Sequence, residues 1–126
     1  MIKFDFNANT KTIPYDRFWT FSVGSCHAAL ALRADYQRQL KKVREDLGFQ
    51  RVRFHGLFND DMKVITRLSD YIPLLPGSKR VKTESFYHIG LVFDFLLSIG
   101  MRPFVELSFM PSALASGKSA TFYYKG

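Results

Sequence analysis

The chain has 126 residues, a length that suits one small domain and is about half of what a complete eight-stranded α/β barrel needs. Hydrophobic residues make up 47% of it and include 13 Phe, so the composition excludes a disordered chain. The 18 Lys and Arg against 11 Asp and Glu give a formal net charge of +7, which is compatible with a nucleic-acid partner. No stacking-aromatic motif of a nucleic-acid fold accompanies these charges, so a solvated outer face is the preferred interpretation and no nucleic-acid partner is predicted.

The cysteine count and the hydropathy of the chain bear on the cellular compartment of the protein. Cys26 is the only cysteine, so no disulfide can form within the chain, which fits a reducing environment. The first residues hold no apolar run like that of a secretory signal. No stretch approaches the length of a membrane span. These features predict a cytoplasmic protein without membrane contact.

The amino-terminal half predicts a strand, a helix and a second strand. Residues 1–17 are expected to form an edge strand or an irregular lead-in, and residues 18–23 a buried strand closed by a glycine. A helical stripe follows, capped by Gly48, and its apolar members are Leu32, Tyr36, Leu40, Val43 and Leu47. Residues 51–56 then read as a strand with Val52 and Phe54 on one face and Arg53 and His55 on the other.

The second half repeats this alternation after a long connection. Residues 57–85 are expected to hold a small β-hairpin excursion over a barrel mouth, with its turn at Pro76-Gly77. The next helical stripe ends at Gly100 and consists of Ile89, Val92, Phe93, Leu96 and Leu97. Residues 103–109 follow as a third strand. The order β-α-β-α-β predicts an α/β fold with a parallel sheet and right-handed crossovers.

His55 is the sharpest candidate for a functional residue. It lies near the carboxyl end of a predicted strand, where α/β barrels place their active sites. Gly56 beside it would allow a ligand to approach the backbone closely. The imidazole could hydrogen-bond a sugar hydroxyl, or it could be held by a neighbouring strand for packing. The pattern alone leaves both roles open.

Three acidic positions permit either chemistry or bracing. Asp60 and Asp61 follow Asn59 and could bind a metal, but without a third spaced ligand, capping or loop bracing is the preferred interpretation. Glu106 is predicted inside an apolar strand, where a carboxylate is unfavourable unless it is paired. It could be a general acid with a raised pKa, or an ion-pair partner of Arg53, and pairing is preferred.

Other reactive groups lack a recognisable arrangement. Cys26 and His27 are sequence neighbours, so their side chains are expected to diverge rather than form a nucleophile pair. The chain contains no Gly-rich phosphate loop, no paired-cysteine zinc spacing and no Gly-x-Ser-x-Gly elbow. Neither a cofactor nor a metal is therefore predicted.

Several blocks in order resemble the amino-terminal part of a family 39 glycoside hydrolase, the group that contains β-xylosidases and α-L-iduronidase. The blocks are Val23-Gly24-Ser25 with Leu30-Ala31-Leu32, Arg53-Phe54-His55-Gly56-Leu57 with Asp60-Asp61, Arg102-Pro103-Phe104-Val105-Glu106 with Phe109-Met110-Pro111, Leu114-Ala115-Ser116-Gly117, and Phe122-Tyr123-Tyr124-Lys125-Gly126. The resemblance runs over nearly the whole chain and is loosest before residue 18 and across residues 62–85. The later blocks look more like bacterial β-xylosidases than iduronidase.

This resemblance implies a (β/α)₈ barrel and retaining hydrolysis of β-xylosides or related glycosides by two glutamates. In the family, the acid/base follows an Asn late in the fourth strand and the nucleophile lies near the seventh. Both regions would fall beyond Gly126, and no Asn-Glu pair occurs in the chain. No catalytic residue is therefore assigned.

The resemblance does imply a first part of the pocket for the glycone, the sugar whose bond is cleaved. His55 matches a histidine that would hydrogen-bond sugar hydroxyls, and Phe122 matches an aromatic that would line the pocket. Gly56 and Glu106 would shape the same wall. The chain departs from the common pattern at residues 25–29 (Ser-Cys-His-Ala-Ala), where the family often has Gly and Arg.

The sequence thus predicts that residues 1–126 are an amino-terminal fragment of a glycosidase barrel, holding its first three β/α units. Its expected partners are a xyloside or oligosaccharide and either the rest of the barrel or a second copy of itself. The alternative is a non-catalytic carbohydrate-binding or scaffold module with a glycosidase-like half-barrel.

Overall fold

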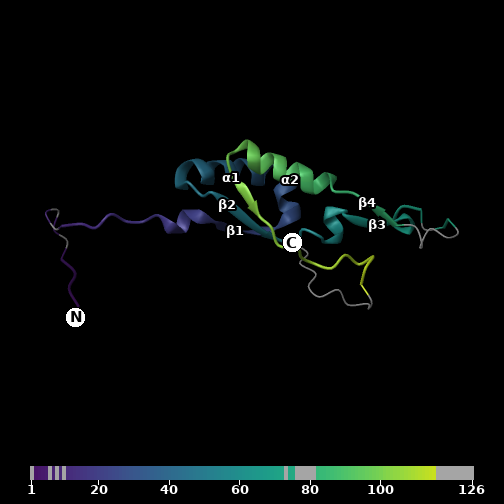
Figure 1. Cartoon of the computed structure of the whole chain (residues 1–126), viewed down its shortest axis with the longest axis horizontal. Coiled ribbons are helices and arrows are strands. Elements are labelled where there is room, and N and C mark those ends of the chain that lie inside the picture. The colour runs from purple at the N-terminus through teal and green to yellow at the C-terminus, as the bar shows by residue number, and fades with distance from the viewer. Residues whose placement is uncertain are drawn as a thin grey trace.

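The computed structural model shows a small parallel sheet with two helices on one side of it (Figure 1). The structure describes residues 2–5, 7, 9, 11–72, 74–75 and 82–115. Residues 11–17 form neither helix nor strand and run away from the rest of the molecule (Figure 1). The lead-in is thus irregular there. Across the described residues, no helix is both long enough and apolar enough to cross a membrane.

The sheet has three strands in the order β1-β2-β5, namely β1 (Val23–His27), β2 (Arg51–His55) and β5 (Arg102–Phe104). Both pairings are parallel, and the register places His27 opposite His55 at the carboxyl ends of β1 and β2. The predicted α/β fold with a parallel sheet is confirmed. Because all strands run the same way, their carboxyl ends meet at one edge.

The first strand lies later in the chain than predicted. Phe18–Phe21 is a 3-10 helical turn, and β1 begins only at Val23. Thr20 closes the turn by donating its N–H to the carbonyl of Arg17 at 2.9 Å. The aromatic run packs sideways instead of entering the sheet, because Trp19 meets the ring of Phe49 edge-on with centroids 5.4 Å apart. Of the aromatic residues in this turn, only Trp19 is partly buried, since Phe18 and Phe21 are 72% and 52% exposed.

The first helix confirms its prediction closely. Helix α1 (Ala34–Leu47) ends at Gly48, which adopts a left-handed φ of +78° and donates its N–H to the carbonyl of Arg44. A residue with a side chain is strained in that conformation, so glycine is favoured at this position. Leu40 is the buried member of the stripe, whereas Leu32 belongs to a preceding 3-10 turn, Ala28–Leu32.

The core lies between the helices and the sheet. Helix α2 (Tyr87–Ser98) contributes Val92 and Leu96, both fully buried, and Val52 of β2 faces them from the sheet side. Burying each of these side chains stabilises the fold by about 1.5–3 kcal/mol. Along β2, Val52 and Phe54 are buried and the residues on either side of them are not, as the period of two in a strand requires.

Two short strands form a second, separate sheet. Strand β3 (Ile65–Arg67) pairs antiparallel with β4 (Lys82–Glu84), and the hydroxyls of Thr66 and Thr83 lie 2.8 Å apart across the pair. This pair extends beyond the end of the main sheet (Figure 1). The predicted turn at Pro76-Gly77 lies outside the described residues.

The third parallel strand is shorter than predicted, since β5 ends at Phe104 instead of continuing to residue 109. Beyond that point the chain leaves the ladder and bonds to the segment after β2. Ser108 accepts a hydrogen bond from the N–H of Phe58 at 2.7 Å through its carbonyl. Its hydroxyl accepts another from the N–H of Gly56 at 3.0 Å. Glu106 therefore lies outside the strand in which it was predicted.

Candidate functional site

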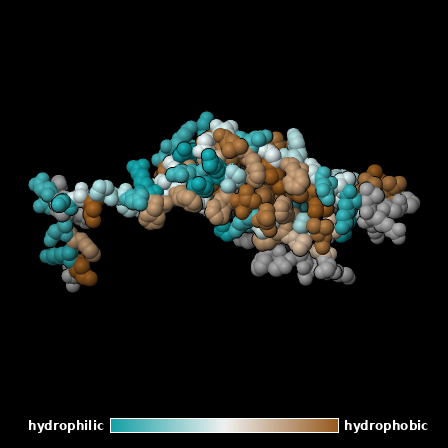
Figure 2. Space-filling model, viewed as in Figure 1, coloured by the Kyte–Doolittle hydropathy of each residue, from teal (hydrophilic) through white to brown (hydrophobic). Residues whose placement is uncertain are grey.

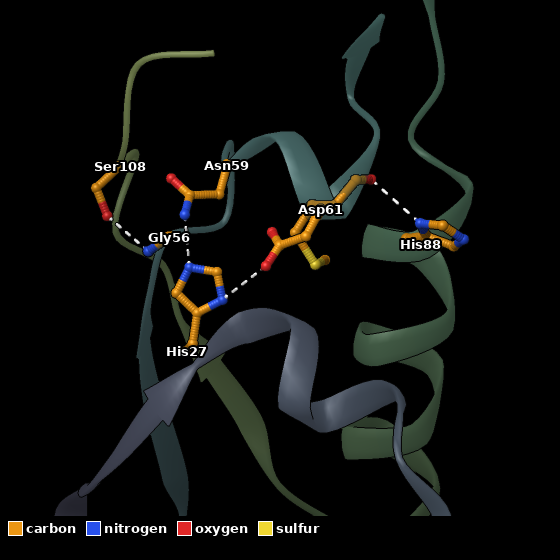
Figure 3. A network of polar contacts seen from close by, with 7 residues as sticks. His27, Gly56, Asn59, Asp61, His88 and Ser108 are labelled. Carbon is orange, nitrogen blue, oxygen red and sulfur yellow. Dashed lines mark hydrogen bonds and ion pairs between the residues drawn. The ribbon is translucent and has the colours of Figure 1, made fainter. Parts of the chain in front are cut away.

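Polar side chains from three segments gather at the carboxyl edge of the parallel sheet (Figure 3). His27 ends β1, Gly56 follows β2, and Ser108 comes from the segment after β5. Asn59 and Asp61 reach the same place from the loop after β2. We call His27, Gly56, Asn59, Asp61 and Ser108 the carboxyl-edge cluster.

His27 is the centre of this cluster and is only 6% exposed. Its Nε2 lies 2.8 Å from the amide nitrogen of Asn59, and its Nδ1 lies 3.2 Å from a carboxylate oxygen of Asp61. The amide N–H of Asn59 donates, so Nε2 must accept, and the imidazole proton is then assigned to Nδ1. His27 therefore donates that proton toward Asp61, and both of its nitrogens are engaged within the protein.

Gly56 provides the space that His27 occupies. Its φ is +73°, and a Cβ built on it would lie 2.1 Å from His27 Nε2. Both the backbone conformation and the close approach of the ring therefore require glycine. The sequence pattern predicts that this opening admits a ligand; in the structure, the imidazole of His27 fills it.

His55 lies beside the cluster, half-buried between two rings. The ring centroid of His27 is 5.7 Å away at an interplanar angle of 73°, and that of Phe109 is 6.2 Å away at 60°. The edge-on contact with His27 and the tilted contact with Phe109 favour one orientation of the His55 ring over others. His55 is thus placed at the carboxyl edge, as its position in the sequence predicts.

The two aspartates brace the loop after β2, as preferred from the sequence. Asp60 accepts a hydrogen bond from the backbone N–H of Ser112 at 2.9 Å and another from its hydroxyl. Asp61 contacts His27, and His88 of α2 donates from Nδ1 to the carbonyl of Met62 at 3.3 Å (Figure 3). Within the described ranges, no three His, Cys, Asp or Glu side chains group closely enough to hold a metal ion.

Glu106 forms the predicted ion pair with Arg53. A guanidinium nitrogen of Arg53 donates to a carboxylate oxygen of Glu106, and the glutamate side chain is the more buried partner at 25% exposed. The pair links β2 to the segment that follows β5. Glu106 thereby keeps a counter-charge although its strand ends two residues earlier.

Two further predictions concern Cys26 and Phe122. Cys26 is exposed while His27 is buried, so their side chains diverge as predicted. Phe122, predicted to line the sugar pocket, lies outside the described residues.

Sequence reasoning missed the role of His27 because the first strand was predicted too early. A strand ending at His27 would have placed that residue level with His55 on the neighbouring strand. Gly56, Asn59 and Asp61 follow directly after β2, so the sequence would then have predicted that they lie beside His27.

An apolar hollow of about 310 Å³ is lined in part by Phe109, whose ring also contacts His55. Its lining residues come from the loop after β2, the start of α2 and the segment after β5, and they are Phe58, Val64, Ile65, Phe86, Leu107, Phe109, Met110, Pro111 and Leu114. Apolar side chains gather on this part of the surface, toward β3 and β4 (Figure 2). An apolar wall beside a few fixed polar groups is the usual composition of a small-molecule site.

Polar residues at the carboxyl ends of successive parallel strands, joined by helical crossovers, are typical of α/β enzymes, both barrels and open sheets. Comparison with known proteins agrees and is more specific. The family model "Glycosyl hydrolases family 39" matches residues 2–126, and the chain belongs to this family.

Relatives in the family are longer than this chain. It is 48% identical over 126 residues to a β-xylosidase of Caldicellulosiruptor saccharolyticus, covering 100% of this chain and 24% of the relative. It is 37% identical over 112 residues to a β-xylosidase of Geobacillus stearothermophilus, covering 89% and 21%. The crystal structure of a monomeric β-xylosidase from Caulobacter crescentus matches with a TM-score of 0.71 at 34% identity, covering 90% of this chain and 21% of that one. The chain therefore spans about a quarter of the length of the curated relatives it matches.

Proposed function

We propose that this chain supplies the first three β/α units of a retaining glycosidase that acts on β-xylosides or related glycosides. In this proposal it forms one wall of the glycone pocket, while both catalytic glutamates lie outside residues 1–126. The β3–β4 pair is then an excursion beside the mouth of the barrel. The observation that carries the proposal is a half-buried histidine, His55, at the carboxyl end of the second parallel strand of a family 39 chain.

The position of His55 suits hydrogen bonding to a sugar. An imidazole nitrogen can exchange a hydrogen bond with a sugar hydroxyl, which serves as either donor or acceptor. Phe109 beside it and the apolar hollow beyond would contact the less polar parts of the glycoside. Gly56, Glu106 and Phe122 would shape the same wall, with Glu106 acting through its pair with Arg53.

The rest of a barrel is the partner that the exposed apolar surface best fits. Phe104 and Val105 at the end of β5 are 44% and 47% exposed, and Leu107 is 77% exposed. In the described part of the chain, β5 has only β2 as a neighbour, so its other edge presents unpaired backbone groups. A further parallel strand would satisfy that edge and bury these side chains.

The test uses a hybrid enzyme that carries the full 126-residue chain in place of the matching region of the Caldicellulosiruptor saccharolyticus β-xylosidase. The hybrid should hydrolyse a chromogenic β-xyloside, and the free chain should not. His55→Ala in the hybrid should raise KM by about 10- to 100-fold, since a hydrogen bond to an uncharged sugar present in ground and transition states is lost.

Two results would contradict the proposal. Turnover by the free chain would show that catalytic carboxylates lie within it. An unchanged KM for His55→Ala in an active, folded hybrid would remove His55 from the pocket wall. Heat released when xylo-oligosaccharides are titrated into the free chain, with no activity in the hybrid, would instead indicate a binding module without catalysis.

A further inference from the structure

We propose that His27 is a positioning residue for His55: it fixes the orientation of the His55 ring and thereby sets the affinity of the site for the glycone. This inference rests on the proposed function, because it concerns the same pocket wall. The contacts around His27, and not its own chemistry, support this role.

His27 is not itself placed to bind a ligand. It is 6% exposed, and both ring nitrogens are engaged, Nε2 by Asn59 and Nδ1 by Asp61. A sugar hydroxyl could reach either nitrogen only by displacing one of these partners. Any influence of His27 on binding must therefore pass through the residues it contacts.

One of these residues is His55 itself. The register sets the two residues opposite each other on β1 and β2, and their rings meet edge-on with centroids 5.7 Å apart. On the other side of His55 lies the ring of Phe109, at 6.2 Å. Hydrogen bonds from an imidazole are directional, so rotating the ring between these two walls would misalign it with a bound hydroxyl.

A second path runs through the backbone that follows His55. The ring of His27 lies over Gly56, the next residue, so closely that no Cβ fits between them. Asn59 and Asp61, three and five residues further on, are both tied to the same imidazole. Asp61 is thus the charged group that faces His27, and the loop from Gly56 to Asp61 is folded around the ring (Figure 3). Removing His27 would free both this loop and one flank of His55.

The experiment is a double-mutant cycle in the hybrid β-xylosidase. His27→Ala should raise KM by about tenfold with kcat changed by less than about threefold, because lost alignment weakens ground-state and transition-state binding alike. His27→Gln retains a group that can accept from Asn59, and it should raise KM by only about threefold. Both increases should disappear when His55 is already Ala, because the orientation of an absent ring has no effect.

His88→Gln is the matched control. His88 hydrogen-bonds to the carbonyl of Met62 in the same loop, and its contact to that loop comes from α2. Its replacement should leave KM within about twofold of that of the unaltered hybrid. If it raised KM as much as His27→Ala does, the effect would come from the loop as a whole and the proposal would be wrong.

The outcomes separate this inference from the proposed function. If His55→Ala raises KM and His27→Ala does not, the role of His55 in the pocket wall is supported and the positioning role of His27 is wrong. If the increase caused by His27→Ala persists in the His55→Ala background, His27 acts independently of His55 and the inference is overturned. If His55→Ala itself has no effect, the proposed function fails. Should His27→Ala not fold, as judged by circular dichroism, His27→Gln decides by the same cycle.

Discussion

The side chains at the two ends of the parallel sheet make different kinds of contact. At the amino end, Trp19 meets Phe49 edge-on at 5.4 Å, and the guanidinium of Arg51 lies 4.1 Å from the ring centroid of Phe21. We call these four residues the amino-end cluster. At the opposite end, the carboxyl-edge cluster is held by directed hydrogen bonds around the buried His27.

Because of this difference, the two clusters should have different effects, one on the stability of the fold and the other also on the positions of side chains. Ring packing depends on buried area and tolerates small shifts, whereas hydrogen bonds require their donors and acceptors to be aligned. In α/β barrels the amino-terminal face of the sheet mainly stabilises the fold and the carboxyl-terminal face carries function. Changes at the amino-end cluster should therefore affect the free energy of unfolding, while changes at the carboxyl-edge cluster should also affect geometry.

The largest effect is expected for Gly56→Ala. The new methyl group would collide with His27, and the positive φ adds strain, so the free energy of unfolding should fall by about 3 kcal/mol or more. Gly48→Ala is the matched control, because its φ is +78° and nothing lies within 4 Å of the added Cβ. It should lose only about 1–2 kcal/mol in the same urea titration.

Combining the substitutions isolates the collision. In a His27→Ala background, Gly56→Ala should lose about as much stability as Gly48→Ala does, because only the backbone strain remains. Equal losses for Gly56→Ala and Gly48→Ala in the unaltered chain would mean that the His27 ring does not lie over Gly56.

A smaller effect is expected at the amino-end cluster. Phe49 is half-buried and packs on the core, so Phe49→Ala should lower the free energy of unfolding by about 2 kcal/mol. Phe18→Ala serves as the control, since Phe18 is 72% exposed and should change stability by less than about 0.5 kcal/mol. The imidazole NMR signals of His27 should stay where they are in both variants. A shift of those signals in Phe49→Ala would show that the two clusters are coupled. It would contradict the expectation that the amino-end cluster affects only stability.

The smallest effect concerns an exposed ion pair near the carboxyl edge. The hydrogen bond from Arg33 and that from the backbone N–H of Tyr36 lower the pKa of Asp35 to about 2. Because this pKa is lower than in the unfolded chain, the stabilisation is complete above the unfolded value and is lost as pH falls through about 2. Being exposed, the pair should change stability little.

Carboxyl ¹³C NMR tests this directly. Asp35 should titrate near pH 2, and Arg33→Ala should move its midpoint up toward the ordinary value of about 3.9. A midpoint near 4 in the unaltered chain would show that the pair does not persist in solution.

The helices and the second strand could be predicted because periodicity reports burial directly. Helix α1 and its glycine cap follow from spacing alone, and β2 follows from strict alternation. The first strand could not be placed this way. Val23–His27 contains Gly, Ser and Cys and has little strand character of its own, so only its pairing with β2 identifies it.

The candidate site was predictable only in part, for the same physical reason. His55 follows from its place at the end of a well-marked strand, and the pairing of Glu106 with Arg53 follows from the unfavourable burial of a lone carboxylate. The arrangement around His27 depends on tertiary contacts between residues far apart in the sequence. The spacing of residues in the sequence does not show that the loop after β2 folds over the ring of His27.

The order of the strands has a consequence for how the protein is made. In the main sheet, β1, β2 and β5 stand side by side in the order in which they occur along the chain. A ribosome therefore releases each strand when the neighbour it must pair with has already emerged, and domains generally fold from the amino terminus as they are synthesised. These three strands can therefore pair one after another during translation.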